Sequence, residues 1–126
     1  MKTINKLENG RAAFAYQCAE KGKKLGEKKS KEYKSYVKKI PMLIKTNGLG
    51  ATVAFMKSKG GTYDTIYNQL AEWFRKEENP IKFEVKDLAK DVCEMDSQQY
   101  RAITKETLAF FNWLRRFAEG LIEGEE

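Results

Sequence analysis

Lysine is the chemistry-bearing side chain that this sequence arranges most regularly. Between Lys21 and Lys39 nine lysines face only two acids, Glu27 and Glu32. At about 100° per residue of a helix, one narrow sector of the segment 31–46 collects Lys31, Lys34, Lys38 and Lys45. Amines spaced about one turn apart suit the phosphates of a nucleic-acid backbone and do not read base edges. A solvated lysine-rich surface without a ligand explains the same pattern equally well.

Most catalytic chemistry is excluded by composition. The chain has no histidine, which removes imidazole bases, Ser-His and Cys-His nucleophiles and nearly all zinc and haem sites. Cys18 and Cys93 lack CxxC spacing, and their apolar neighbours predict two small buried hydrophobes. No phosphate-binding GxxxxGK[ST] loop or dinucleotide-binding glycine motif is present. We therefore expect a binding protein that is not an enzyme and uses no metal or cofactor.

The charge is unevenly divided along the chain. Residues 1–63 contain 14 Lys and 1 Arg against 4 Glu, a net charge of +11, whereas residues 64–126 carry −5. A helix predicted over 84–95 places Val85, Leu88, Val92 and Met95 inward. The same helix places an acidic ridge outward, formed by Glu84, Asp87, Asp91 and Glu94. Such a ridge could bind magnesium, but carboxylates one turn apart are more often a solvated face or a surface for a protein partner.

The elements that position these side chains are all predicted to be helices, because helical spacing recurs and no alternating strand pattern occurs. We expect one domain over residues 1–126, an all-α compact bundle of five to six helices. The expected helices cover 4–25, 31–46 with a kink at Pro41, 49–59, a stretch capped by Thr62, 84–95, and a last helix that follows a cap at Asp96-Ser97. No membrane span or signal peptide is apparent, so we expect a cytoplasmic protein.

Three further interpretations concern the core and its edge. The row formed by Tyr63, Ile66, Tyr67, Leu70, Trp73 and Phe74 could stack bases, but its spacing is more typical of a core face. Arg11 lies near an apolar stripe and is interpreted as a core-edge arginine whose charged end reaches solvent. In the last helix, Leu108 falls on the polar face beside Arg115 and Arg116. We interpret it as an exposed leucine suited to a protein contact.

Two segments carry more than helical spacing. Residues 36–55 read YVKKIPMLIKTNGLGATVAF and residues 100–120 read YRAITKETLAFFNWLRRFAEG. The first resembles the KKxPxLIxTNGLGxTxAF core of the small subunit of the Cmr (type III-B) CRISPR effector complex. The second resembles the YRxLTxExLAFxNWLxRFAEG block at that family's carboxyl end. The resemblance extends over essentially the whole chain, including RAAFA at 11–15, and is weaker over 61–96.

This resemblance implies a small, all-helical, non-catalytic subunit of an antiviral ribonucleoprotein. Family members stack in several copies beside the backbone subunits that hold the guide RNA, and they help to form the groove for single-stranded target RNA. The implied partners are therefore the backbone and large subunits, further copies of this chain, guide RNA and target RNA. Sequence-independent contact by a lysine row fits this role, because pairing with the guide can supply the specificity.

The site candidates combine charge geometry with the matched segments. For RNA binding we select Lys31, Lys34, Lys38, Lys39, Lys45, Lys57, Lys59, Arg101, Arg115 and Arg116. Only Lys38, Lys39, Arg101 and Arg116 occupy basic positions of the two matched segments, and the others rest on charge alone. For contacts between subunits we select Glu84, Asp87, Asp91, Glu94 and Leu108, because an acidic ridge could meet the lysines of a neighbouring copy.

Three rival functions remain open. The first is a stand-alone basic helical regulator that binds duplex DNA, although the helix after Asn47-Gly48 offers few side chains for base edges. The second is a metal-dependent nuclease that uses the acidic ridge. The third is a protein-only scaffold whose lysines keep it soluble.

Overall fold

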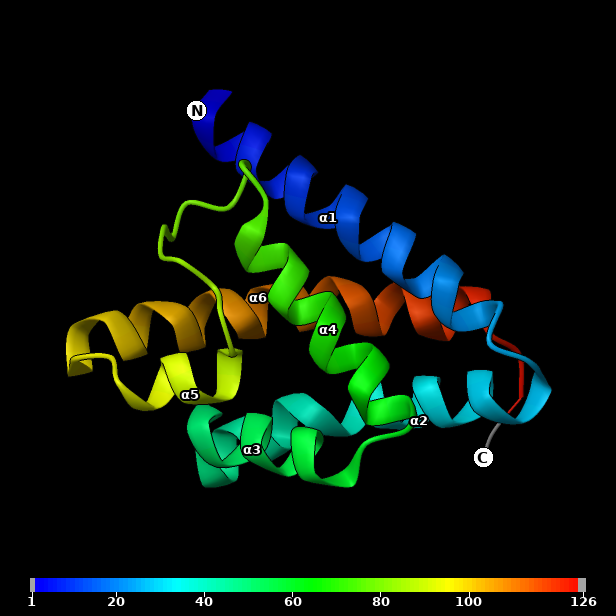
Figure 1. The fold of residues 1–126 in the computed structure, drawn as a ribbon. Helices are drawn as coiled ribbons and strands as arrows, with labels where there is room; N and C mark the ends of the chain where they lie inside the picture. The colour runs from blue at the N-terminus through cyan, green and yellow to red at the C-terminus, as the bar shows by residue number, and fades with distance from the viewer. Residues whose placement is uncertain (1, 125–126) are drawn as a thin grey trace.

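The structure, a computed structural model, describes residues 2–124, with side chains from residue 7 onward. The described residues form six helices and no strand (Figure 1). The helices are α1 (Lys2–Lys23), α2 (Glu27–Asn47), α3 (Leu49–Lys59), α4 (Thr62–Arg75), α5 (Leu88–Cys93) and α6 (Ser97–Leu121). The predicted all-α bundle is therefore confirmed. The second helix, α2, contains Pro41 and continues beyond it, and the kink expected at Pro41 stays a prediction.

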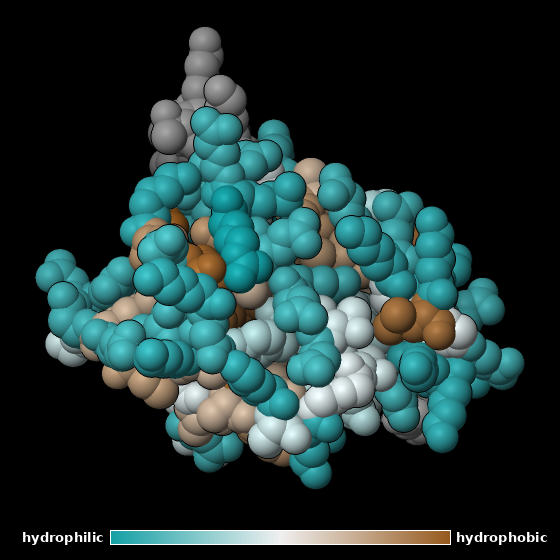
Figure 2. Space-filling model, in the orientation of Figure 1, coloured by the Kyte–Doolittle hydropathy of each residue, from teal (hydrophilic) through white to brown (hydrophobic). Residues whose placement is uncertain are grey.

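The helices pack around α6, which is the longest element. It lies along α1 and also contacts α2, while α4 crosses the middle of the bundle and α3 packs beside α2 (Figure 1). An extended connection between α4 and α5 runs along one side of the molecule. Hydrophilic side chains cover most of the face shown in Figure 2, with only small separated apolar patches.

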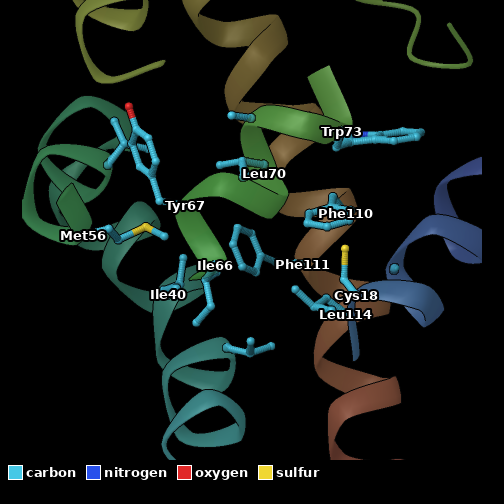
Figure 3. Close-up of a cluster of buried hydrophobic side chains, with 14 of the residues drawn as sticks. Cys18, Ile40, Met56, Ile66, Tyr67, Leu70, Trp73, Phe110, Phe111 and Leu114 are labelled. Atoms are coloured by element: carbon cyan, nitrogen blue, oxygen red, sulfur yellow. The ribbon is translucent and has the colours of Figure 1, made fainter. Parts of the chain in front are cut away.

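All six helices contribute buried side chains to the core, and Figure 3 shows its central part, where labelled side chains of α1, α2, α3, α4 and α6 meet. The predicted apolar face of α4 is confirmed as core, because its six members from Tyr63 to Phe74 are all buried. The ring of Phe14 in α1 stacks on both Trp73 and Phe110, with centroids 5.9 Å apart in each case. A helix that buries one continuous stripe in this way gains its stability from packing.

A buried ion pair joins α1 to α6. The Nε of Arg11 donates to Oε2 of Glu106 at 2.7 Å, and a second nitrogen donates to Oε1 at 2.8 Å. The indole nitrogen of Trp73 also donates to Oε2, at 2.9 Å. The hydrogen bond with Glu106 raises the pKa of Arg11 above its ordinary value. The prediction that the charged end of Arg11 reaches solvent is therefore wrong. Glu106, 95 residues away in the sequence, holds the guanidinium inside the bundle.

The acidic segment 84–95 differs most from its prediction, because only Leu88–Cys93 is helical. Asp91 explains where the helix begins: its Oδ2 accepts hydrogen bonds from the backbone amides of Lys86 and Asp87, at 3.0 and 3.2 Å. These bonds hold the residues before α5 outside the helix. Leu88 and Val92 are buried, as expected, but the four acids do not share one helix face, and the predicted ridge is wrong.

Two helix starts also differ. The helix α2 begins at Glu27, four residues earlier than expected, because Gly26 at φ +107° turns the chain directly into it. Thr62 is the first residue of α4 and not its cap; its hydroxyl donates to Oε1 of Glu32 in α2, at 2.9 Å. Asp96 does cap α6 as predicted, by accepting from the amide of Gln99. Cys18 is buried as expected, but Cys93 is exposed.

Candidate nucleic-acid interface

The exposed face of α2 carries three of the predicted lysines. Val37, Ile40 and Ile44 are buried against the core, and this orientation leaves Lys38, Lys39 and Lys45 exposed to solvent. We call these three residues the α2 lysine strip. Their amines extend from one rigid helix, so the strip presents positive charge without the entropic cost of ordering a loop.

The other two lysines of the predicted row are engaged within the chain. The Nζ of Lys34 donates to the carbonyl oxygens of Ile122 and Gly124, at 3.0 Å each. Lys31 lies against Gly124, and its amine is 3.8 Å from a carboxylate oxygen of Glu27. Both lysines are half-buried. The prediction that the whole row faces solvent is therefore wrong at this end, where Lys34 holds the C-terminal segment.

A methionine occupies the centre of the strip. Met42 is 67% exposed, and it follows Lys38 by four residues and precedes Lys45 by three. Residues at these spacings are neighbours on a helix surface. Met42 was not among the predicted site residues, although its helical position falls in the same sector as Lys38 and Lys45. An apolar side chain therefore lies among the amines.

A hollow of about 520 Å³ lies beside the strip, where α2, α3 and α4 meet. We call it the aromatic pocket; it is lined by Glu32, Tyr36, Lys39, Phe55, Lys59, Gly60, Gly61, Thr62 and Tyr63. The amine of Lys39 lies 5.8 Å from the ring centroid of Tyr36, and that of Lys59 lies 5.8 Å from that of Phe55. The structure thus brings together two of the predicted RNA-binding lysines from different helices.

The rings of the aromatic pocket support one another. Tyr36 and Tyr63 stack with centroids 3.9 Å apart and planes 3° from parallel, and Phe55 packs edge-on against Tyr63 at 5.2 Å. Burial raises the pKa of the Tyr63 hydroxyl. The prediction that Tyr63 belongs to the core is confirmed, whereas Tyr36 and Phe55 were not predicted to line a site. Their signal was a lysine three or four residues further along the same helix, a spacing that brings side chains together.

Lys57 and Asp87 were predicted for two different surfaces, yet they bind each other. The Nζ of Lys57 lies 2.7 Å from Oδ2 of Asp87, and the hydroxyl of Tyr67 donates to Oδ1 at 2.8 Å. The hydrogen bond between Lys57 and Asp87 raises the pKa of the amine, and together with the Tyr67 hydroxyl it lowers the pKa of the carboxyl. Each charge therefore already has a partner in the isolated chain.

The basic residues of α6 keep the predicted solvent face. Arg101, Arg115 and Arg116 are all exposed on this one continuous helix. Leu108 was predicted to be exposed, but it is half-buried and packs against the core. Of the predicted acids, Glu84 and Glu94 remain exposed.

The two segments that carry the family resemblance contact each other. The backbone amide of Gly50 donates to the hydroxyl of Tyr100 at 2.8 Å. Gly48 turns the chain between α2 and α3 at φ +91°, and its carbonyl accepts from the hydroxyl of Thr52 at 2.8 Å. A side chain at Gly48 would be strained, because few residues other than glycine adopt this conformation. These motif residues therefore join the α2–α3 turn to the start of α6, which is a structural role.

Neither metal-binding groups nor membrane-spanning helices are found among residues 2–124. No group of three or more Cys, Asp or Glu side chains in this range is arranged to hold a metal ion. No helix in the same range is both long and apolar enough to cross a membrane.

Comparisons with known proteins by family model, by sequence and by structure agree with one another. The family model described as CRISPR-associated protein (Cas_Cmr5) matches residues 7–121. The CRISPR system Cmr subunit Cmr5 of Thermus thermophilus is 30% identical over 124 residues, covering 98% of this chain and 99% of that protein. The crystal structure of a CRISPR-associated Cmr5 family protein from the same organism superposes with a TM-score of 0.77 at 30% identity, covering 93% of this chain and 98% of that one.

Proposed function

Because the chain belongs to the Cmr5 family of CRISPR-associated proteins, we propose that it is a non-catalytic subunit lining the groove for single-stranded target RNA in a Cmr complex. The observation that supports RNA contact is the α2 lysine strip, with Lys38, Lys39 and Lys45 exposed on one helix. Arg101, Arg115 and Arg116 form a second exposed basic set on α6. Lys31, Lys34 and Lys57 contribute less, because their amines already have partners within the chain.

The proposed mechanism is electrostatic. Lysines that neutralise phosphates release counterions, which gives affinity without sequence preference and a strong dependence on salt. Lysine is a flexible point charge, so the strip follows a backbone and does not select bases. Sequence specificity is left to base pairing between the guide and the target.

Affinity purification tests the proposed role in its native setting. A tagged chain expressed in its own host should bring down further Cmr proteins together with a short processed guide RNA. The captured RNA should disappear when the tagged chain is prevented from assembling with those proteins. Capture of duplex DNA without Cmr proteins would instead support a stand-alone regulator, and capture of Cmr proteins without RNA would support a protein-only scaffold.

We also propose that copies of the chain lie next to one another along the RNA. Asp87 is paired with Lys57, and Asp91 is bound to backbone amides. The acids that can meet a neighbour's lysines are therefore Glu94, which is exposed, and Glu84, whose ion pair with Lys86 at 3.4 Å lies at the surface and is weak. Contacts of this kind between different surfaces build open filaments.

Charge reversal tests this contact between copies. Glu84→Lys combined with Glu94→Lys should reduce the yield of multi-copy complex at about 50 mM salt, and the difference should vanish at about 1 M, where the screening length is about 3 Å. The control is Glu77→Lys with Glu119→Lys, which makes the same charge change at other exposed positions. Equal assembly by both double variants would contradict a role for Glu84 and Glu94.

A further inference from the structure

The α2 lysine strip explains contact with phosphates, but it does not explain the aromatic pocket beside it. We propose that this pocket holds one nucleotide of single-stranded RNA, with the base against Phe55 and Tyr36 and a phosphate near the amines of Lys39 and Lys59. The inference rests on the proposed function, since it assumes that the strand lies on this surface. It adds a base contact to an interface that otherwise touches only the backbone.

The size and openness of the pocket fit such a ligand. Its volume of about 520 Å³ lies within the range of about 300–1,000 Å³ that is typical of sites for small organic ligands. Gly60 and Gly61 form part of its lining, and a side chain built at Gly61 would meet nothing within 4 Å. The pocket is therefore open on the side of the α3–α4 turn.

The charges of the pocket favour an anion. Lys39 and Lys59 are exposed, and neither amine forms an ion pair with any residue in the described part of the chain. Glu32 is the only acid in the lining, and its Oε1 accepts a hydrogen bond from the hydroxyl of Thr62. Two positively charged amines and one negatively charged carboxylate give the pocket a net positive charge.

The rings supply the second part of the recognition. Tyr36 and Phe55 are half-buried, so each is fixed by packing while part of the ring remains at the surface. Every nucleobase has a π-face, and aromatic side chains beside basic ones are the usual platform for single strands. An amine lies 5.8 Å from the centroid of each ring, within reach of the phosphate of a nucleotide stacked there.

Position links the pocket to the strip. Lys39 belongs to both, and Tyr36 lies about one turn before it, half-buried at the edge between the core face and the solvent face of α2. A strand that follows Lys45, Lys38 and Lys39 therefore arrives at the pocket without leaving the helix. This continuity favours RNA over a peptide of another subunit, which would need no lysine path leading to the site.

A comparison of normal and abasic RNA tests the proposal. Phe55→Ala should weaken binding of a short single-stranded RNA about tenfold. It should leave binding of an abasic strand of equal length unchanged, because that strand keeps its phosphates and has no base to stack. A single 2-aminopurine in the RNA should lose fluorescence on binding the wild type through stacking, and lose less on binding Phe55→Ala.

The matched control is Phe83→Ala. Phe83 is also half-buried and packs on a ring of the core, Phe74, with centroids 5.8 Å apart, but it lies outside the aromatic pocket. Circular dichroism and thermal melting of both variants identify any loss of folding. Phe83→Ala should bind both strands as the wild type does.

The outcomes separate this proposal from the function on which it rests. If the wild type binds normal and abasic strands equally well, the pocket proposal is overturned while the backbone contact stands. Equal weakening of both strands by Phe55→Ala overturns it too, because the ring then acts through the fold. Failure of the wild type to bind either strand overturns the proposed RNA contact itself. Unchanged RNA binding by Phe55→Ala with loss of assembly would identify the pocket as a protein contact.

Discussion

Replacing Glu106 with alanine should lower the free energy of unfolding by about 3–5 kcal/mol, because it leaves a buried guanidinium without its partner. The side chains of Arg11 and Glu106 are 9% and 6% exposed, so water cannot replace the lost carboxylate. Glu8 contacts Arg11 at 3.2 Å but is itself half-exposed, and it compensates little. The indole nitrogen of Trp73 loses its acceptor at the same time.

Urea denaturation followed by circular dichroism measures this change. Glu119→Ala is the control, since Glu119 is an exposed acid on the same helix and its removal should cost less than about 0.5 kcal/mol. The double variant Arg11→Met with Glu106→Met should be more stable than Glu106→Ala, because neither charge is then left alone. A loss below about 1 kcal/mol for Glu106→Ala would mean that the guanidinium finds water or another acceptor.

Charge reversal of the α2 lysine strip should nearly abolish RNA binding. With Lys38, Lys39 and Lys45 all changed to Glu, affinity for single-stranded RNA at about 50 mM salt should fall about a hundredfold or more. Three lost phosphate contacts should also reduce the slope of log affinity against log salt by about 2, at about 0.7 per contact on a single strand. The slope is the sharper readout, since it counts contacts.

The control for this variant keeps the same net charge. Lys82, Lys86 and Lys90 are exposed in and after the α4–α5 connection, and changing all three to Glu alters the total charge by the same amount. This control should retain most of the affinity, because it leaves the strip intact. Fluorescence anisotropy over a salt series measures both variants. Equal losses in the two would show that only the total charge matters and that the strip is not the binding surface.

The faces of the long helices could be predicted from sequence alone. Repeating apolar residues placed Tyr63 to Phe74 of α4 in the core, and Ile103, Phe110 and Leu114 of α6 are buried as expected. The period of 3.6 residues is a local property, so a helix that has one apolar stripe has only one way to face a core. The same rule predicts that Lys38, Lys39 and Lys45 face solvent, so this part of the candidate site could be predicted from the sequence.

Partners distant in sequence could not be predicted in this way. Arg11 and Glu106 are 95 residues apart, and Lys34 and the carbonyl of Ile122 are 88 apart. The pattern around each residue indicated only a charge near an apolar stripe. Segment 84–95 differs for another reason: its apolar spacing fits a helix, but the backbone amides of Lys86 and Asp87 donate to the carboxylate of Asp91, and the helix begins only at Leu88.

Local periodicity and motifs contiguous in the chain were enough to predict the helical class, the family and the outward direction of Lys38, Lys39 and Lys45. Which charges remain available to a ligand depends on the packing of the helices. This packing paired Lys57 with Asp87, placed Lys34 under the C-terminal segment, and joined Lys39 to Lys59 across two helices around Tyr36 and Phe55. The physical reason is that electrostatic and stacking contacts depend on distance in space, which packing of the bundle sets.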